Sequence, residues 1–232
     1  MVRYLGPKIK IIRRLGILPG LTNKISKLRK KSPGEHGKRI FSKSLRTTLS
    51  GDYRERLLEK QKLKYNYGLT EKQLSNYYKK AKQKKSSTGS LLLASLESRL
   101  DCILYRLGFA PTIAAARQFI THRHILVNNY LVNIPSFLCQ KGDIITIKQN
   151  IKSKKLIETF FEKQIKKREI ILERLKETKL TQIGQKYLIK SLLPSHLQIE
   201  SKTLEGKVLS FSKRKNVSVN VNELKVIEYY SK

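Results

Sequence analysis

The stretch from residue 93 to residue 150 most narrows what this chain can fold into, because its apolar residues recur first with helical and then with strand spacing. The first run predicts one helix that ends at Gly108, since glycine commonly stops a helix in the left-handed conformation. The apolar face of that helix comprises Leu93, Leu96, Leu100, Ile103, Leu104 and Leu107. Pro111 and Thr112 then open a second helix, whose buried side is expected to hold Ile113, Ala116 and Ile120.

Three short β-rich runs follow these helices. Residues 125–127 and 131–132 flank Asn128 and Asn129, and asparagine tolerates the left-handed backbone that a tight hairpin needs. Residues 144–147 supply a further strand. The order helix, helix, hairpin, strand predicts a compact α+β module.

The charge of the chain indicates its partner, because the residues outside this module are far more basic than the module itself. The chain has 50 Lys and Arg against 17 Asp and Glu, a formal net charge of +33, and its first ninety residues hold 25 of the bases and five of the acids. A polyanion cancels this self-repulsion, and release of its counterions drives association. Nucleic acid is therefore the leading partner, and an anionic membrane surface is second.

The basic N-terminal part divides into two patterns. Residues 1–50 contain three prolines and several glycines without a long apolar period, which predicts an extended arm that orders against a partner, or a disordered tail. Residues 51–92 carry two helical patterns, the first from Asp52 to Asn66. The second follows Thr70, because its spacing to Gln73 fits a capping box.

The C-terminal part predicts less regular structure. Residues 151–193 are rich in Lys, Glu and Ile and predict one long amphipathic helix. Its candidate apolar contacts are Ile157, Phe161, Ile165, Leu172 and Leu175. From Pro194 the chain is expected to be irregular or to form short strands, and to close with a short helix after Asn222.

Several features argue against enzymes, metals and membranes. Cys102 and Cys139 lack metal-ligand spacing, and no Gly-rich phosphate loop, Ser/His/Asp order or paired-carboxylate site is present. His122 and His124 lack a third ligand, so they are a weak zinc signal. No cofactor is expected. The longest apolar run is too short to span a bilayer, and the chain opens without a secretory core, so we expect it to act where it is made.

Short blocks spread along the chain resemble, in order, the ribosomal protein S4 family of the small subunit. Outside the module these blocks are RYLGPK at 3–8, PGEHG at 33–37, residues 54–68 and VIEYYS at 226–231. Inside it they are LESRLD at 96–101, YRLGF at 105–109, AARQ at 115–118, HILVN at 124–128 and VNIPS at 132–136. The blocks LPGLT at 18–22 and HILVN resemble plastid members in particular.

The resemblance implies an α+β fold in two parts. A helical N-terminal domain would comprise an extended basic arm over residues 1–50 and helices over 51–92, completed by residues 194–232. An S4-type RNA-binding module over residues 93–150 would be inserted in it, followed by a Lys/Glu-rich helical extension over 151–193. That extension looks longer than is usual in the family. Some members bind zinc through N-terminal cysteines, and none precedes Cys102 here, so no metal is expected.

The resemblance also implies the function. The chain would be a structural constituent of the small ribosomal subunit, would bind 16S-type rRNA directly, and would help nucleate subunit assembly. It would lie near the path by which mRNA enters and contribute to translational accuracy. Its partners would be rRNA, neighbouring small-subunit proteins and mRNA, with no membrane. The expected location is the plastid ribosome, and the alternative is the bacterial cytoplasm.

The residues expected to contact rRNA carry cationic or hydrogen-bonding side chains. They are Arg3, Tyr4, Lys8, Lys10, Arg13, Arg14, His36, Arg54, Lys60, Lys62, Lys64, Arg99, Arg106, Arg117, Gln118, His122, Arg123 and His124. The last five are expected to form one RNA edge at the end of the second module helix, and the Arg117 side chain is expected to lie outside the core. For Arg99, a phosphate contact and a salt bridge to Glu97 or Asp101 are equally favoured.

Two rival functions stay open at this point. The run Arg99-Leu100-Asp101 is similar to the sequence around the catalytic Asp of pseudouridine synthases, which would make the chain an RNA-modifying enzyme. Too few residues follow the module for a separate catalytic domain. A free RNA-binding regulator that carries an S4 module is the second rival, and the terminal blocks at 3–8 and 226–231 argue against it.

Overall fold

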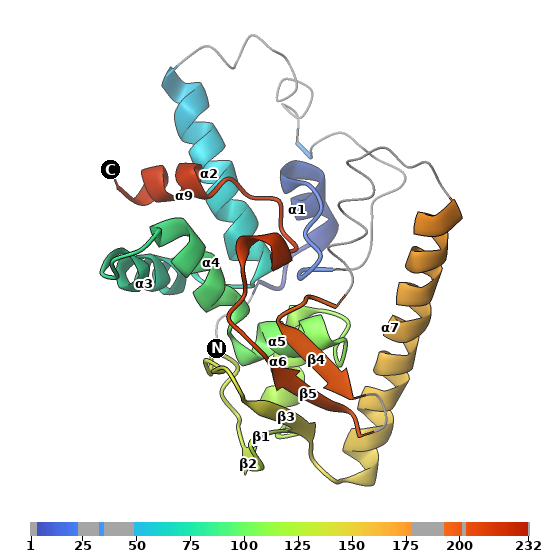
Figure 1. Cartoon of the computed structure of the whole chain (residues 1–232). Helices are drawn as coiled ribbons and strands as arrows, with labels where there is room; N and C mark the ends of the chain where they lie inside the picture. Colours follow the sequence, from blue (N-terminus) through green and yellow to red (C-terminus); the bar gives the residue numbers. More distant parts are fainter. Residues whose placement is uncertain (1–3, 23–32, 35–48, 178–192, 201–202, 232) are drawn as a thin grey trace. The chain divides into compact units, whose positions relative to one another are not determined.

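The computed structural model describes residues 4–22, 33–34, 49–177, 193–200 and 203–231 (Figure 1). The chain forms two compact units. Unit 1 comprises residues 1–92 and 219–232, and unit 2 comprises residues 93–218. The boundary between the two units falls within the helix α4 (Thr88–Glu97), whose first residues belong to unit 1 and whose last residues belong to unit 2.

Unit 1 is helical. It contains α1 (Lys8–Leu15), α2 (Leu49–Asn66), α3 (Glu71–Lys82) and the C-terminal α9 (Glu223–Tyr230). The capping box at the start of α3 forms as predicted, with the Thr70 hydroxyl accepting from Gln73 N and the Gln73 side chain accepting from Thr70 N. The short helix after Asn222 is also confirmed, because the Asn222 side chain accepts from Leu224 N.

The helix α9 packs against α2 and α3 through aromatic rings and a buried valine. Tyr230 stacks on Tyr78 of α3 at 5.0 Å between ring centroids, and Tyr229 lies 5.9 Å from Tyr53 of α2. Val226 is fully buried. The last residues of the chain therefore complete a core that was begun far earlier in the sequence.

The start of the chain differs from the expected extended arm. Residues 8–15 form the two-turn helix α1, which buries Ile11, Ile12 and Leu15. The backbone N–H of Gly20 then donates to Asn66 Oδ1 at 3.0 Å, which attaches the chain beyond α1 to the end of α2. The apolar period of α1 is only two turns long, so the surrounding prolines and bases obscured it.

Unit 2 contains a five-stranded antiparallel sheet in the order β2-β1-β3-β5-β4. Its strands are β1 (Ile125–Val127), β2 (Tyr130–Leu131), β3 (Ile144–Ile147), β4 (Leu197–Glu200) and β5 (Glu205–Val208). The predicted hairpin turn is confirmed, since Asn128 and Asn129 have φ values of 52° and 67°. Figure 1 shows α5 and α6 against one face of this sheet.

The prediction of one helix up to Gly108 was wrong. The chain forms α4 and then α5 (Leu100–Leu107), with a break at residues 98–99. The first N–H groups of α5 donate to the loop before β3, from Leu100 N to Phe137 O and from Asp101 N to Pro135 O. A helical break leaves N–H groups without intrahelical acceptors, and these tertiary carbonyls satisfy them. Gly108 ends α5 at φ 95°, as predicted.

The helix α6 (Ile113–Thr121) begins at Thr112, whose hydroxyl accepts from Ala115 N. The long helix predicted over residues 151–193 is confirmed up to residue 177, as α7 (Ile151–Glu177). Ile157 and Phe161 enter the core of unit 2, and Ile165 packs beside it. The side chains of Leu172 and Leu175 and residues 178–192 lie outside the described part.

The tail also divides differently from the expectation that residues 194–232 join the helical domain. Residues up to 218 belong to unit 2 because β5 pairs with β3, with Ile145 opposite Gly206. The absence of a side chain at Gly206 lets Leu107 of α5 approach the strand. Only residues 219–232 return to unit 1. Within the described residues, no helix is both long and apolar enough to cross a bilayer.

Candidate nucleic-acid interface

A group of exposed polar side chains lies where α6 ends and the chain enters β1. Gln118, Thr121, His122 and Arg123 are all exposed. The Thr121 hydroxyl donates back to the carbonyls of residues 117 and 118 at 3.0 and 3.1 Å. The other three side chains, together with the neighbouring Lys148, are called the α6 edge below.

His124 is less exposed than its neighbours. Its Nδ1 lies 2.8 Å from Ser153 Oγ of α7, and its carbonyl accepts from Lys148 N at 2.9 Å. Burial, followed by the nearby His122 and Lys148, lowers the pKa of His124. The imidazole is therefore neutral at pH 7 and acts through hydrogen bonds. Lys148 is exposed beside it, and the sequence interpretation missed this lysine because only strand pairing brings it to the edge.

The expectation that the Arg117 side chain lies outside the core was wrong. Its Nε donates to Asp101 Oδ2 at 2.7 Å, and the side chain is only 13% exposed. The same carboxylate accepts from Arg99 Nε and Nη2 at 3.0 and 2.8 Å. Asp101 thus joins α6 to the start of α5, and Arg117 has a structural partner.

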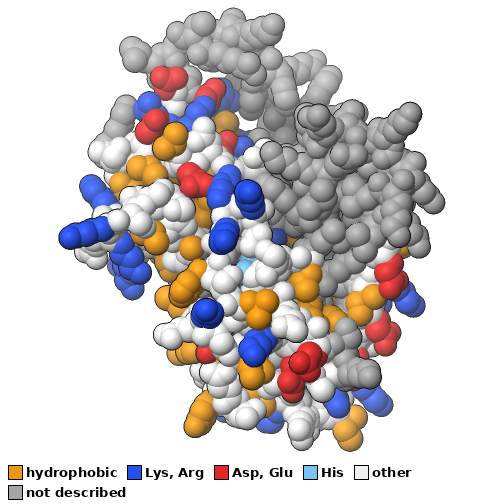
Figure 2. Space-filling view, in the orientation of Figure 1, with side chains coloured by type: hydrophobic (Ala, Val, Ile, Leu, Met, Phe, Trp, Pro, Cys, Tyr) orange, Lys and Arg blue, Asp and Glu red, His pale blue; other side chains and the backbone are white. Residues whose placement is uncertain are grey.

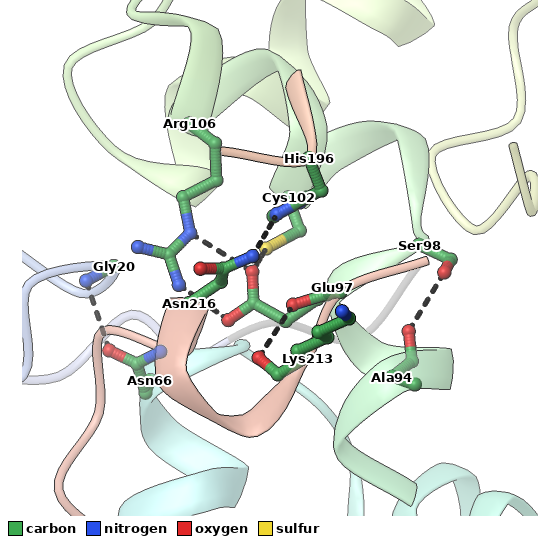
Figure 3. Close-up of polar contacts among 11 residues, drawn as sticks. Gly20, Asn66, Ala94, Glu97, Ser98, Cys102, Arg106, His196, Lys213 and Asn216 are labelled. Atoms are coloured by element: carbon green, nitrogen blue, oxygen red, sulfur yellow. Dashed lines mark hydrogen bonds and ion pairs between the residues drawn. The ribbon is translucent and has the colours of Figure 1, made fainter. Parts of the chain in front are cut away.

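Arg99 and Arg106 are also removed from the expected RNA surface. Both are buried, and Arg99 makes the salt bridge to Asp101 that was one of its two predicted roles. Arg106 donates two hydrogen bonds to the Glu97 carboxylate, from Nε at 2.9 Å and from Nη2 at 2.5 Å (Figure 3). A buried charge needs such a partner, and Glu97 at the end of α4 and Asp101 on α5 supply the carboxylates.

The cysteines lie in the interior of unit 2. Cys102 Sγ donates to Glu97 Oε2 at 3.2 Å (Figure 3), and burial, with Glu97 nearby, raises the pKa of its thiol well above the usual value. Burial raises the pKa of Cys139 to about 12. Both side chains are protonated thiols at neutral pH, and protonated thiols are poor nucleophiles and metal ligands.

Unit 1 carries a separate set of cations on α1. Lys10 and Arg14 are exposed and Lys8 and Arg13 are partly exposed, on the side of the helix away from its buried apolar residues. Tyr4 is 43% exposed and packs edge-on against Tyr65 at 5.4 Å between ring centroids. These predicted residues are therefore placed where a ligand can reach them.

The predicted lysines of α2 differ in their placement. Lys60 is buried, with Nζ 2.9 Å from Glu71 Oε1 and 4.4 Å from the Tyr229 ring centroid, so it does not lie on a surface where the expected RNA contact could form. Lys62 pairs with Glu59 at 2.5 Å, and Lys64 lies 3.7 Å from Glu71 Oε2. Arg54 is partly exposed. The predicted contacts Arg3 and His36 lie outside the described residues.

An exposed cluster of five lysines at the end of α3 was not among the predicted contacts. It comprises Lys79, Lys80, Lys82, Lys84 and Lys85. Figure 2 shows basic side chains gathered over α3. The high density of lysines in this stretch is visible in the sequence, and it could have marked these residues as candidate rRNA contacts. Across the described part of the chain, no three His, Cys, Asp or Glu side chains are grouped to hold a metal.

Comparison with known proteins identifies the family. The sequence model described as the ribosomal protein S4/S9 N-terminal domain matches residues 3–97, and the one described as the S4 domain matches residues 98–145. The small ribosomal subunit protein uS4c of Cyanophora paradoxa is 47% identical over 232 residues, which cover all of both chains. The chain belongs to the ribosomal protein S4 family. In the same family, uS4c of Emiliania huxleyi is 46% identical and uS4 of Thermosynechococcus vestitus is 44% identical, each across all of this chain and 99% of the relative.

Membership in the S4 family confirms the resemblance and the α+β fold class. The family is structural and not enzymatic, so the pseudouridine synthase alternative is set aside. A match along the entire chain also argues against a short regulator that shares only the module. The matches run through residues 151–193, so these relatives have a segment of similar length, and the extension is not peculiar to this chain.

Proposed function

We propose that this chain is a structural constituent of the small ribosomal subunit and binds 16S-type rRNA directly. The α6 edge carries the proposal, because it exposes Gln118, His122, Arg123 and Lys148 together on a module of the S4 type. Duplex RNA hides most base edges in a deep, narrow groove. Cations and hydrogen-bond donors held on a rigid edge therefore suit recognition of backbone and shape.

The backbone of Arg123 supports this function. Arg123 has φ 61°, and its N–H donates to Ile120 O at 2.9 Å just beyond α6. Glycine or asparagine suits this left-handed position better, and a larger side chain there costs about 1–2 kcal/mol. The presence of an arginine at a position with that cost supports a role in binding a ligand.

The substitution Arg123→Gly tests the proposal, because stability and binding should change in opposite directions. The melting temperature should hold or rise, while affinity for a small-subunit rRNA fragment should fall about tenfold, as expected for loss of one charge-assisted contact. The slope of log affinity against log salt should become shallower by about one unit. Filter binding at several salt concentrations measures both quantities, and Arg123→Lys is the control that keeps the charge.

Two outcomes would contradict different parts of the proposal. Unchanged binding by Arg123→Gly at every salt concentration would remove the α6 edge as a contact. A flat salt dependence of the parent protein would exclude rRNA binding through phosphates, because phosphate contacts release counterions.

Within this function we place a role in nucleating subunit assembly, a position near the path of incoming mRNA, and an effect on translational accuracy. The family match and the relatives' names support a place in the small ribosomal subunit, and these finer roles are what the resemblance to the family implies. The partners would be rRNA, neighbouring small-subunit proteins and mRNA. Sucrose-gradient fractionation of native extract should place the chain with small subunits even at high salt. Its sedimentation apart from ribosomal particles at low salt would refute this placement.

The proposed location is the plastid ribosome. The support comes from relatives of the plastid uS4c type, which match the entire chain at 46–47% identity. The 44% identity to a cyanobacterial uS4 leaves a bacterial cytoplasm as the second candidate. Fractionation of purified organelles would distinguish them.

A further inference from the structure

A short segment after β5 presents an exposed aromatic ring followed by two exposed lysines. Phe211 is 61% exposed, and Lys213 and Lys215 are exposed on the same segment. The three are called the Phe211 patch. None of them was among the residues predicted to contact rRNA, and they lie in unit 2, away in sequence from the α6 edge.

The segment that carries the patch is held at both ends by one buried residue, His196. Leu209 N donates to the His196 carbonyl at 2.9 Å before the patch, and Asn216 Nδ2 lies 3.1 Å from His196 Nδ1 after it (Figure 3). His196 itself is only 4% exposed. The segment is therefore closed into a loop whose two ends are fixed to the interior of unit 2.

Residues inside the loop alternate in burial. Ser212 is buried between the exposed Phe211 and Lys213, and Val217 is buried beyond Lys215. The one-turn helix η4 (Arg214–Asn216) follows Lys213, and Asn216 N donates to Lys213 O at 2.9 Å. The alternation directs the ring and the two ammonium groups outward, and the anchored backbone has little freedom left to lose on binding.

The chemistry of the patch selects its ligand. An exposed phenylalanine ring gains by stacking on another flat surface, and residues 209–218 contain three bases and no acid. A nucleotide whose base is unpaired offers both a π face and flanking phosphates. A fully paired duplex offers the phosphates but keeps its bases stacked inside.

We propose that the Phe211 patch is a second RNA-binding site, at which Phe211 stacks on an unpaired base while Lys213 and Lys215 contact the adjacent phosphates. This inference rests on the proposed rRNA-binding function and adds a chemically different contact to it. The α6 edge would recognise backbone, whereas the patch would recognise a single-stranded nucleotide such as one in a loop, bulge or junction.

The absence of tryptophan from the chain makes a direct test possible. In the variant Phe211→Trp the indole is the only one in the protein, and stacking on a base quenches its fluorescence. An rRNA fragment with unpaired nucleotides should quench it, whereas a fully paired duplex of equal length should not. Leu224→Trp is the matched control, since Leu224 is 69% exposed on α9 between Glu223 and Lys225, and Lys225 is paired with Glu55; its fluorescence should stay unchanged with either RNA.

Binding measurements complete the test. Phe211→Ala should weaken binding to the fragment about 5- to 100-fold, the range for loss of one stacked base, with the salt slope unchanged. Phe211→Tyr should bind like the parent. Lys213→Ala and Lys215→Ala should each make the salt slope shallower by about one unit. The melting temperature of Phe211→Ala should match the parent, because the ring is exposed.

The outcomes separate this inference from the proposed function. Failure of the parent to bind rRNA would overturn both. Steep, salt-dependent binding by the parent, combined with parent-like affinity of Phe211→Ala or equal quenching of Phe211→Trp by duplex RNA, would overturn only the stacking site. Loss of binding to a ribosomal protein but not to RNA in Phe211→Ala would also overturn it, by assigning the patch to a protein partner.

Discussion

The two units use their charges in different ways. In unit 2, Glu97 and Asp101 are about 1% exposed and hold buried arginines with paired hydrogen bonds. In unit 1, the ion pairs between α2 and α9 lie in partial contact with solvent, as in Arg56 with Glu228, whose side chains are 20% and 51% exposed. Solvent screens the second kind strongly, whereas loss of one partner in the first kind leaves a charge buried without compensation.

This difference separates stability from binding. The net charge of +33 counts every arginine alike, yet Arg99 and Arg106 are occupied inside unit 2. The cations that remain exposed include Arg123 and the lysines at the end of α3, and these are the ones that the proposed RNA binding could use. A formal charge therefore measures the attraction of the chain to a polyanion without locating the contacts.

The largest effect should come from breaking a buried pair in unit 2. Arg106→Ala leaves the Glu97 carboxylate buried without its partner and should lower the free energy of unfolding by about 3–5 kcal/mol. Chemical denaturation followed by circular dichroism measures it. Arg117→Ala should cost less, because Asp101 keeps Arg99, and the double variant Glu97→Leu with Arg106→Met should recover much of the loss. A cost below about 1 kcal/mol for Arg106→Ala would show that this pair contributes no more than a surface pair does.

A smaller effect is expected at the helix contacts of unit 1. The Tyr230 hydroxyl donates to Glu71 Oε1 at 2.9 Å. Partial burial opposes ionisation of Glu71, but hydrogen bonds from Lys60 and Tyr230 lower its pKa overall. Tyr230→Phe should therefore destabilise the protein by about 1–2 kcal/mol. Tyr130→Phe, which changes a hydroxyl on a 78% exposed ring in unit 2, is the control and should be neutral. Equal melting temperatures for the two variants would argue against the Glu71 contact.

The smallest effect should be a pH dependence from His196. Burial lowers the pKa of His196 below its unfolded value of about 6.5. Above that pH both states are neutral and the contribution is constant. As the pH falls below this value, His196 becomes protonated in the unfolded chain but stays neutral in the folded chain. The free energy of unfolding therefore falls by at most about 1.4 kcal/mol per pH unit. His196→Gln should make the loss between pH 7 and 5 shallower, and His124, shifted in the same direction, should account for part of the remainder. An unchanged pH profile in His196→Gln would remove His196 as a source.

Sequence reasoning succeeded where the structure is determined locally. Thr70 with Gln73, Gly108, and Asn128 with Asn129 each fix a backbone turn through their own chemistry, and all three features form. The break before α5 could not be predicted, because its N–H groups find acceptors in the loop before β3, more than thirty residues later. The assignment of β5 to unit 2 likewise depends on pairing with a strand about sixty residues earlier.

The same distinction applies to the candidate site. The exposure of His122 and Arg123 could be predicted, because the chain that leaves α6 after Thr121 must present these residues before Ile125 enters the sheet. Arg117 lies on the same helix, but its partner Asp101 is on α5, and only tertiary packing brings the two together. Whether a basic side chain is available to RNA depends on such partners, and periodicity does not reveal them.

Unit 1 is built from two separate stretches of the chain, and this affects when it can fold during synthesis. Unit 2 is one continuous stretch of chain, so every residue it needs has been made before the ribosome reaches residue 219. Unit 1 lacks α9 until the last residues are added, and until then Tyr53 and Tyr78 have no Tyr229 and Tyr230 to pack against. Domains generally fold as units in the order of their synthesis, yet here the part that begins first finishes last. A chain released a dozen residues early would carry a folded unit 2 beside an unfinished unit 1.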